Sequence, residues 1–441
     1  MIKGVLFLLY FCITFYSFSQ KEYVTVGYAF TTNLVTENYE GCANLVDEAY
    51  KSKITAKVLK QIWDAMLLKF GDCKNHYINC ADTTKTKQVF VTLEFKKEKL
   101  DIRIILSDAD GVIGLFFVPT KADCGTELYY SNPFYDNPKK YKKEQFKFLS
   151  DTVNLYGTLF TPKTNKKAIC FIVHGSGPHD RYGTIGANKP YRDLAVGLAT
   201  VGIECYIYDK KSFTYRIPDE SITVEKEVVN DALAMIQYIK NKDANKDVPL
   251  YIIGHSLGGM LAPKIAELAN NSVSGVVFLA ANARPLDVLV KEQVNYLLKL
   301  KGSDISEQDK MQIKMLEMQI NYLHDSLTFL SPKEKLPLNL PASYWLSLNK
   351  YNQINTAKNL TIPLLFLQGK RDYQVTKADL KTWKQALGKN KMARYKQFPK
   401  LNHLFMEGKG KPNPDEYFNS SKNIPFYVIK YIEKWIAEQK L

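Results

Sequence analysis

The sequence has few histidines, no closely paired cysteines and an N-terminal apolar run that is too short to cross a membrane. Six histidines occur in 441 residues, and none of the seven cysteines belongs to a Cys-x-x-Cys pair, so zinc ligation is not expected. The apolar run from Gly4 to Phe18 has about 15 residues, whereas a spanning helix needs ~20. We therefore predict no metal, no other cofactor and no stable membrane insertion.

The same N-terminal run fits a secretory signal peptide. Lys3 precedes the apolar stretch, and the small residues Ser17 and Ser19 flank Phe18 in a small-x-small cleavage pattern. We predict that residues 1–19 are a signal peptide cut after Ser19, and that the protein is exported to the periplasm or the extracellular space. An uncleaved membrane anchor is the alternative.

The excess of basic residues has no concentrated site. The formal net charge is +15, but the lysines are spread along the chain and no arginine-rich block with interleaved aromatic residues occurs. This distribution is typical of a solvated lysine-rich surface, so we predict no nucleic-acid partner. With 46% hydrophobic residues, the composition is that of a globular protein with a sizeable core.

Four cysteines lie between the predicted signal peptide and residue 125, and we expect oxidation among them in an exported protein. Four cysteines allow three connectivities. Our preferred pairing joins Cys73 to Cys80, which flank a predicted polar loop, KNHYIN, and leaves Cys42 and Cys124.

The first part of the chain reads as a small α+β domain over residues 23–125. Apolar residues recur at helical spacing from Thr55 to Phe70, and the runs QVFVTLEF, LDIRIIL and VIGLFFV then alternate as antiparallel strands do. On its W…FG…V-x-L-E-F…DG-x-I-x-G pattern, this part resembles the small domain of unknown function, with a cystatin-like or nuclear transport factor 2-like fold, that precedes exported bacterial hydrolases. Residues 126–147 are polar and punctuated by proline, so we predict a linker there.

The second part, residues 148–441, alternates strand and helix patterns. Runs such as AICFIVHG, IECYIYD, PLYIIGHS, GVVFLAA and PLLFLQG are separated by helical segments, which predicts a mostly parallel sheet with helices on both faces. Residues 283–358 have no strand pattern and contain a Met-rich helical run, KMQIKMLEMQINYL. We predict that this insertion is a helical cap.

A Gly-x-Ser-x-Gly sequence lies between a strand and a helix in the stretch YIIGHSLGGMLAP. Gly254, Ser256 and Gly258 are its defining residues. So tight a turn requires flanking positions without a Cβ atom, and it pushes the serine above the sheet edge as a nucleophile elbow. We predict that Ser256 is a nucleophile.

A nucleophilic serine needs a base and an orienting carboxylate, which follow it in the order Asp or Glu, then His, in α/β-hydrolases. His403 is the histidine left when the others are eliminated by position: His76 lies in the first domain, His174 and His179 precede Ser256, His255 abuts it, and His324 lies in the cap. Asp372 follows the strand run PLLFLQG and is our predicted acid. Asp379 is its competitor, but a role as a first-turn helix acid suits it better.

An oxyanion hole should take one N–H from Leu257, the residue after the nucleophile, and a second from the loop after an earlier strand. The loop HGSGPHDR supplies it, so we assign the second donor to the backbone of Ser176, with Gly177 next.

These motifs together resemble the α/β-hydrolase superfamily over residues ~148–441, and in particular exported bacterial hydrolases with HGSGPxDR, GHSLGGMLAP, QGxxDxQV and LNHLF. These hydrolases also have a YDKR-like strand end, which stands here as YDKKSFTY, so the match departs at Lys211, where arginine is expected. The resemblance implies an α/β-hydrolase fold with a Ser256-Asp372-His403 triad, and it covers both carboxylesterases and serine aminopeptidase or prolyl-oligopeptidase domains.

The predicted function is a serine esterase acting on a small-molecule ester through an acyl-enzyme. Tyr344 and Trp345 in the cap are candidate substrate-pocket residues, with a role in the cap core as an equal alternative. A peptidase acting on short peptides is the second hypothesis, although the seven-bladed propeller repeats of prolyl oligopeptidases are missing. A non-catalytic exported binding protein on a hydrolase scaffold is the hypothesis from another class.

Overall fold

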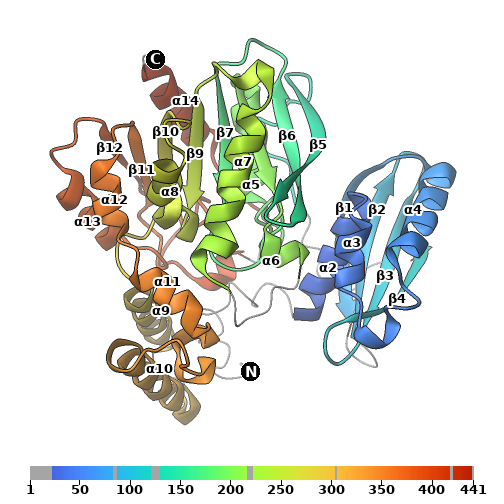
Figure 1. Cartoon of the computed structure of the whole chain (residues 1–441), viewed down its shortest axis with the longest axis horizontal. Helices are drawn as coiled ribbons and strands as arrows, with labels where there is room; N and C mark the ends of the chain where they lie inside the picture. The colour runs from blue at the N-terminus through green and yellow to red at the C-terminus, as the bar shows by residue number, and fades with distance from the viewer. Residues whose placement is uncertain are drawn as a thin grey trace. The chain divides into compact units, whose positions relative to one another are not determined.

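The chain forms two compact units, each with its own hydrophobic core, in a computed structural model (Figure 1). The described residues are 22–82, 87–120, 130–215, 222–302, 305–417 and 421–439. The predicted signal peptide and Cys124 lie outside them. The smaller unit lies within Ser17–Tyr129 and Ser212–Arg216, and the larger one within Tyr130–Lys211 and Ile217–Leu441.

The smaller unit packs helices on one antiparallel sheet of four strands in the order β1-β2-β3-β4. Helix α2 crosses the sheet closely at Gly27, where a Cβ atom would lie 2.9 Å from Cβ of Val89. Thr55 caps α4 by accepting from the N–H of Val58, and Gly71 ends that helix with φ 80°. Its elements are α2 (Glu22–Val35), α3 (Tyr39–Asn44), a 3₁₀ turn (Glu48–Tyr50), α4 (Ala56–Phe70), β1 (Cys73–Asp82), β2 (Lys87–Phe95), β3 (Lys99–Leu106) and β4 (Val112–Pro119).

The alternate apolar residues of β2 face the core of the smaller unit, as predicted. On β2, Val89, Val91 and Leu93 are fully buried in the core that also takes Trp63 from α4. The predicted α+β character of this unit is therefore confirmed.

The preferred disulfide pairing was wrong. The stretch between Cys73 and Cys80 is not a loop but part of strand β1, paired antiparallel with β2. An extended strand separates residues seven positions apart by roughly 23 Å, far beyond the ~6 Å Cα spacing of a disulfide. Cys80 is disulfide-bonded, whereas Cys73 and Cys42 are thiols whose sulfurs donate to the carbonyls of Asn75 and Phe30.

The larger unit is built on an eight-stranded sheet in the order β12-β11-β10-β9-β7-β8-β6-β5. The pairs β5–β6 and β6–β8 are antiparallel, and the others are parallel. Strands β7 to β11 are buried at every position, as central parallel strands covered on both faces must be. The strands are β5 (Tyr141–Ser150), β6 (Val153–Pro162), β7 (Ala168–Val173), β8 (Ile203–Tyr208), β9 (Leu250–His255), β10 (Gly275–Leu279), β11 (Leu364–Gly369) and β12 (Ala393–Phe398).

Helices cover both faces of this sheet (Figure 1). Helices α5 and α14 pack together on one face, so closely that a Cβ at Gly197 would lie 2.8 Å from Cγ1 of Ile429. Helices α7 and α8 lie on the other face. The helical elements are α5 (Pro190–Thr200), a π-helical turn (Glu225–Val229), α7 (Asn230–Lys240), α8 (Leu257–Leu268), α13 (Lys377–Leu387) and α14 (Phe426–Glu438), with 3₁₀ turns at Asp243–Asn245 and Pro414–Tyr417. Helix α6 (Lys211–Thr214) belongs to the smaller unit from Ser212 onward.

The insertion between β10 and β11 is helical over its described residues, as predicted for a cap. Helix α10 begins at a capping box in which Ser306 and Asp309 bond each other's backbone N–H. The insertion comprises α9 (Leu286–Lys301), α10 (Glu307–Asp325), α11 (Ala342–Asn349) and α12 (Gln353–Asn359), with 3₁₀ turns at Lys333–Lys335 and Pro337–Asn339.

The strand order and the cap confirm the predicted α/β-hydrolase fold, but the predicted linker was too long. Residues 141–147 begin strand β5, and Tyr135 is 6% exposed with its hydroxyl bonded to the carbonyl of Ile424. Aromatic packing outweighs the polar and proline-rich composition of this segment.

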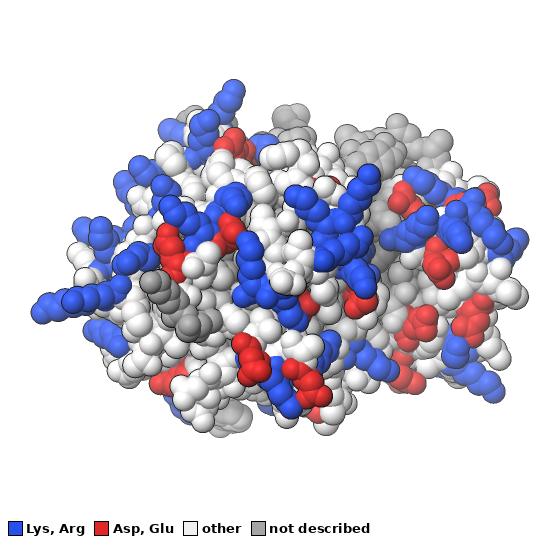
Figure 2. Space-filling model, turned by 90° about the horizontal axis from the view of Figure 1, so that it is seen from above, with Lys and Arg blue, Asp and Glu red and all other residues white. Residues whose placement is uncertain are grey.

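The described residues contain no helix long and apolar enough to span a membrane. On the face in Figure 2, lysines and arginines lie among acidic and uncharged residues. The absence of a nucleic-acid partner stays a prediction.

Candidate active site

Ser256 lies in a turn that only small flanking residues permit. It follows β9 and precedes α8, with φ 54° and ψ −119°, a strained conformation for a residue with a side chain. A Cβ at Gly254 would lie 2.6 Å from the carbonyl oxygen of Gly258, and one at Gly258 would lie 2.3 Å from that of Val173. The N–H of Ser256 donates to the carbonyl of Leu279 at 2.9 Å. The turn therefore has the tightness expected of a nucleophile elbow.

Asp372 and His403 meet at the ends of the next strands. Asp372 follows β11 and His403 follows β12, and Nδ1 of His403 lies 2.8 Å from Oδ2 of Asp372, with both side chains fully buried. Since a carboxylate accepts, Nδ1 carries the proton, which leaves the lone pair of a neutral ring on Nε2.

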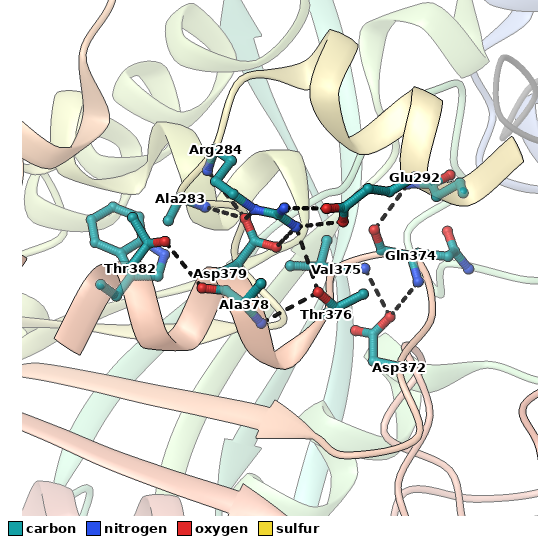
Figure 3. A network of polar contacts seen from close by, with 12 residues as sticks. Ala283, Arg284, Glu292, Asp372, Gln374, Val375, Thr376, Ala378, Asp379 and Thr382 are labelled. Atoms are coloured by element: carbon teal, nitrogen blue, oxygen red, sulfur yellow. Dashed lines mark hydrogen bonds and ion pairs between the residues drawn. The ribbon is translucent and has the colours of Figure 1, made fainter. Parts of the chain in front are cut away.

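Backbone and side-chain donors hold the Asp372 carboxylate. Its Oδ1 accepts from the N–H groups of Gln374 and Val375, at 2.8 and 2.9 Å (Figure 3). Its Oδ2 also accepts from Nε2 of Gln368 at 3.1 Å. These contacts fix the oxygen that faces His403.

Asp379, the other candidate for the triad acid, has a different role from Asp372. It is fully buried in the first turn of α13, and its Oδ1 accepts from the N–H groups of Ala283 and Arg284. The guanidinium of Arg284 bonds both Asp379 and Glu292 (Figure 3). Asp379 therefore anchors the residues that lead into the cap.

The loop after β7 lies against the elbow. A Cβ at Gly175 would lie 3.4 Å from Cβ of Ser256, and Ser176 lines the same pocket as Ser256. Leu257 is the first residue of α8, where backbone N–H groups have no acceptor within the helix. Gly177, the second choice in this loop, has φ 86° and is not among the residues that line the pocket.

A small pocket lies at Ser256, with a cavity volume of about 10 Å³. Ile185, Pro190 and Leu404 give it apolar walls, and Leu404 directly follows His403. The pocket thus brings the elbow, the loop after β7 and the His403 loop to one place.

Tyr344 and Trp345, the predicted substrate-pocket residues, do not line this pocket. Both are buried, at 3% and 1% exposure. The Tyr344 hydroxyl donates to Oε2 of Glu227 at 2.7 Å, and Nε1 of Trp345 donates to the carbonyl of Pro337 at 3.2 Å. The alternative interpretation, a role in the interior of the cap, fits the contact of Trp345, whereas Tyr344 bonds a residue outside the cap.

His255 and Tyr191 form a hydrogen-bonded chain that the sequence did not reveal. Nε2 of His255 lies 3.0 Å from the carbonyl oxygen of His403 and must donate to it, so Nδ1 accepts from the Tyr191 hydroxyl at 3.0 Å. That hydroxyl accepts in turn from the N–H of Gly175 at 3.2 Å. The chain joins the loops that carry Gly175 and His403.

Burial keeps the other histidines near the site neutral. It lowers the pKa of His174 and of His255 well below the ordinary value. Burial first, and the charge of Lys210 second, lower the pKa of His179 to about 3.

Three buried cations follow the strand-end motifs. Arg181, of the motif HGSGPHDR, bonds the carboxylate of Asp209 through its backbone N–H at 2.7 Å and its Nε at 3.1 Å. Lys211, where arginine was expected, pairs with Asp151 and Asp231 at 2.6 and 3.0 Å. Lys210 bonds the carbonyl of Gly175. The charged residues that directly follow the apolar run in IECYIYDKK could have indicated buried ion pairs here, because a buried charge needs a partner.

No cluster of His, Cys, Asp and Glu suited to a metal ion occurs in the described parts of the chain.

Comparison with known proteins places this geometry in a family. Residues 164–409 match the family model described as "Serine aminopeptidase, S33", and residues 28–115 match "Protein of unknown function (DUF3887)". Esterase EstD of Thermotoga maritima is 32% identical over 432 residues, which cover 97% of each chain. Monoglyceride lipase of Mus musculus is 26% identical over 157 residues, 34% of this chain and 48% of its own.

Among solved structures, Est1E from Butyrivibrio proteoclasticus with bound ferulic acid has a TM-score of 0.43 at 16% identity, over 67% of this chain and 98% of its own. The Pyrococcus furiosus esterase Pf2001 has a TM-score of 0.44 at 12% identity, over 72% of this chain and 97% of its own. With the family model matching residues 164–409 and a relative aligned over nearly its whole length, this chain belongs to the S33 serine aminopeptidase family of α/β-hydrolases.

Proposed function

We propose that this protein hydrolyses carboxylic esters through an acyl-enzyme formed on Ser256. The observation that carries the proposal is the buried contact of 2.8 Å between His403 and Asp372 at strand ends beside the elbow. The similarity to an esterase along 97% of the chain supports ester rather than amide substrates.

In the proposed first half-reaction, Oγ of Ser256 attacks the acyl carbonyl carbon while Nε2 of His403 takes its proton. Asp372 holds the Nδ1–H and stabilises the imidazolium. The carbonyl oxygen becomes an oxyanion that accepts from the N–H groups of Leu257 and Ser176. Collapse breaks the bond to the alkoxy oxygen, which leaves as the alcohol with the proton from His403.

In the second half-reaction, His403 takes a proton from water as the water oxygen attacks the acyl carbon. The same donors stabilise the second oxyanion. The bond to Oγ then breaks, His403 returns the proton to Ser256, and the acid leaves.

The pocket favours small acyl groups. Its cavity volume of about 10 Å³ is far below the ~300–1,000 Å³ of sites for drug-sized ligands. We therefore expect kcat/KM for p-nitrophenyl esters to be highest for acetate to butyrate and lower for decanoate, measured at concentrations below micelle formation.

The decisive test is labelling of Ser256. A fluorophosphonate probe should give one adduct, located by mass spectrometry on the peptide with Ser256, and the probe should block ester hydrolysis. Ser256→Ala should keep its melting temperature and lose both. A folded wild-type sample that neither labels nor hydrolyses any ester would instead support the non-catalytic binding protein.

An aminopeptidase is the second candidate, because the matching family model is described as a serine aminopeptidase. Aminoacyl p-nitroanilides compared with p-nitrophenyl esters separate the two activities. Faster cleavage of the anilides would overturn the ester proposal while leaving the role of Ser256 intact.

We also propose that the protein is exported after removal of residues 1–19. Lys3 and the apolar run to Phe18 support this, and so does the disulfide at Cys80, because disulfides persist in oxidising compartments. N-terminal sequencing of the mature protein from cell fractions tests it. An intact Met1 in the cytoplasmic fraction would contradict export.

A further inference from the structure

We infer that Lys210 is a positioning residue that orients the Ser176 N–H of the oxyanion loop, and that Glu227 and Tyr344 tie this lysine to the cap. The inference rests on the proposed function. It gives Tyr344, which does not reach the pocket, a role that acts through other residues.

Lys210 is a buried cation aimed at the backbone of the oxyanion loop. It is 2% exposed and follows strand β8 by two residues. Its Nζ donates to the carbonyl oxygen of Gly175 at 3.0 Å and to Oε1 of Glu227 at 2.6 Å. A buried ammonium requires such partners, because burying it without them would cost several kcal/mol.

The bond to Gly175 fixes the neighbouring donor through the geometry of the peptide group. In a planar trans peptide the carbonyl of Gly175 and the N–H of Ser176 point in opposite directions. With the carbonyl held by Lys210, the Ser176 N–H is held facing away from the lysine, and Ser176 lines the pocket together with Ser256. The N–H of Gly175 donates to the Tyr191 hydroxyl at 3.2 Å, which restrains the preceding peptide as well.

A glycine needs this restraint more than other residues do, because it has the largest backbone freedom. A Cβ at Gly175 would have only ordinary contacts, 3.4 Å from that of Ser256 and 3.6 Å from Nδ1 of His255, so no clash restrains the backbone at this position. The loop is thus oriented by neighbouring side chains.

The partner of Lys210 links it to the cap. Glu227 is 4% exposed and lies in the π-helical turn Glu225–Val229, a local geometry often found near functional sites. Its Oε2 accepts from the Tyr344 hydroxyl of cap helix α11 at 2.7 Å. On the same helix, Ser347 donates to Oε2 of Glu225 at 2.5 Å. Helix α11 is therefore bonded to two carboxylates of this turn, and one of them holds Lys210.

The main test is the double variant Lys210→Met/Glu227→Gln, which removes the pair without leaving a lone buried charge. With p-nitrophenyl butyrate, we expect kcat to fall about 10- to 100-fold, approaching the loss seen when an oxyanion donor is deleted, with KM within about threefold. Tyr344→Phe keeps the ring and removes one hydrogen bond, so its kcat should fall by a smaller factor of about three to ten.

Inhibition by a trifluoromethyl ketone distinguishes a positioning role of Lys210 from a merely structural one. Oγ of Ser256 adds to its carbonyl carbon, the serine proton passes to His403, and the oxygen becomes an oxyanion. Its inhibition constant should rise by the same factor as kcat falls. Lys211→Met is the matched control, because it removes a neighbouring ion pair with Asp151 and Asp231 and should lower only the melting temperature.

Unchanged kcat and ketone affinity in a folded double variant would overturn the inference, as would equal losses in Lys211→Met. If the double variant does not fold, Tyr344→Phe decides by the same two measurements. A wild-type protein without esterase activity would refute the proposed function itself, whereas an active wild type with unaffected variants would refute only the role of Lys210.

Discussion

Replacing Asp372 by asparagine should nearly abolish activity without removing an atom from the site. Both carboxylate oxygens of Asp372 accept hydrogen bonds, Oδ1 from the N–H groups of Gln374 and Val375 and Oδ2 from His403 and Gln368. An asparagine has one acceptor oxygen and one donor nitrogen. The two backbone donors therefore select its oxygen for the Oδ1 position.

The amide nitrogen then faces Nδ1 of His403, so two donors meet unless the imidazole shifts its proton to Nε2. That tautomer cannot accept the proton of Ser256. In the serine protease triad, the same exchange lowers kcat by about 10⁴, which corresponds to about 5 kcal/mol of transition-state stabilisation. We expect a loss of that order here, with KM changed much less.

The measurement is kcat and KM for p-nitrophenyl butyrate, with thermal unfolding to confirm the fold. Asp379→Asn is the matched control, because Asp379 is an equally buried aspartate on a neighbouring element that bonds Ala283 and Arg284 (Figure 3). It should lower the melting temperature and keep kcat within about threefold. Asp372→Asn with more than a tenth of wild-type kcat, or a larger loss in Asp379→Asn, would refute the assignment.

Three further outcomes are expected. Gly258→Ala places a Cβ 2.3 Å from the carbonyl oxygen of Val173, so it should destabilise the fold by about 1–3 kcal/mol or more and abolish activity. Gly114→Ala is the control, because its Cβ would have only ordinary contacts, from 3.4 Å. An equal effect of the two variants would count against the nucleophile elbow. Burial lowers the pKa of His179 to about 3, so between about pH 3 and 6.5 this residue binds a proton in the unfolded chain but not in the folded one. As the pH falls through that range, the free energy of unfolding should therefore fall by about 1.4 kcal/mol per pH unit on account of this group. His179→Gln should lessen that slope in urea titrations, and an unchanged slope would show that His179 titrates normally. Shifting the ester panel from butyrate to decanoate should lower kcat/KM, and a rising series would contradict a small acyl pocket at Ser256.

Local patterns predicted most elements of the sheet and the helical cap. Strands β7 to β11 are continuous apolar runs, and such runs carry their own signal because both faces of a central parallel strand are buried. The edge strand β5 was missed because it is largely exposed and its lysine-rich sequence resembles a linker, and β6, which lies between β5 and β8, was missed with it. Strand β1 was read as a loop for the same reason, and the disulfide pairing was wrong with it.

The sequence by itself determined the elbow, because a Gly-x-Ser-x-Gly turn between a strand and a helix is a local feature, and the order of acid and base along the chain followed from it. Only the tertiary structure decided which buried groups meet across the fold: Lys210 with Gly175 and Glu227, Tyr191 with His255, and Tyr344 with Glu227 in place of the substrate pocket. Their separations along the chain reach 117 residues. Hydrogen bonds between such distant residues depend on how helices and strands pack, and no periodicity in the sequence encodes them.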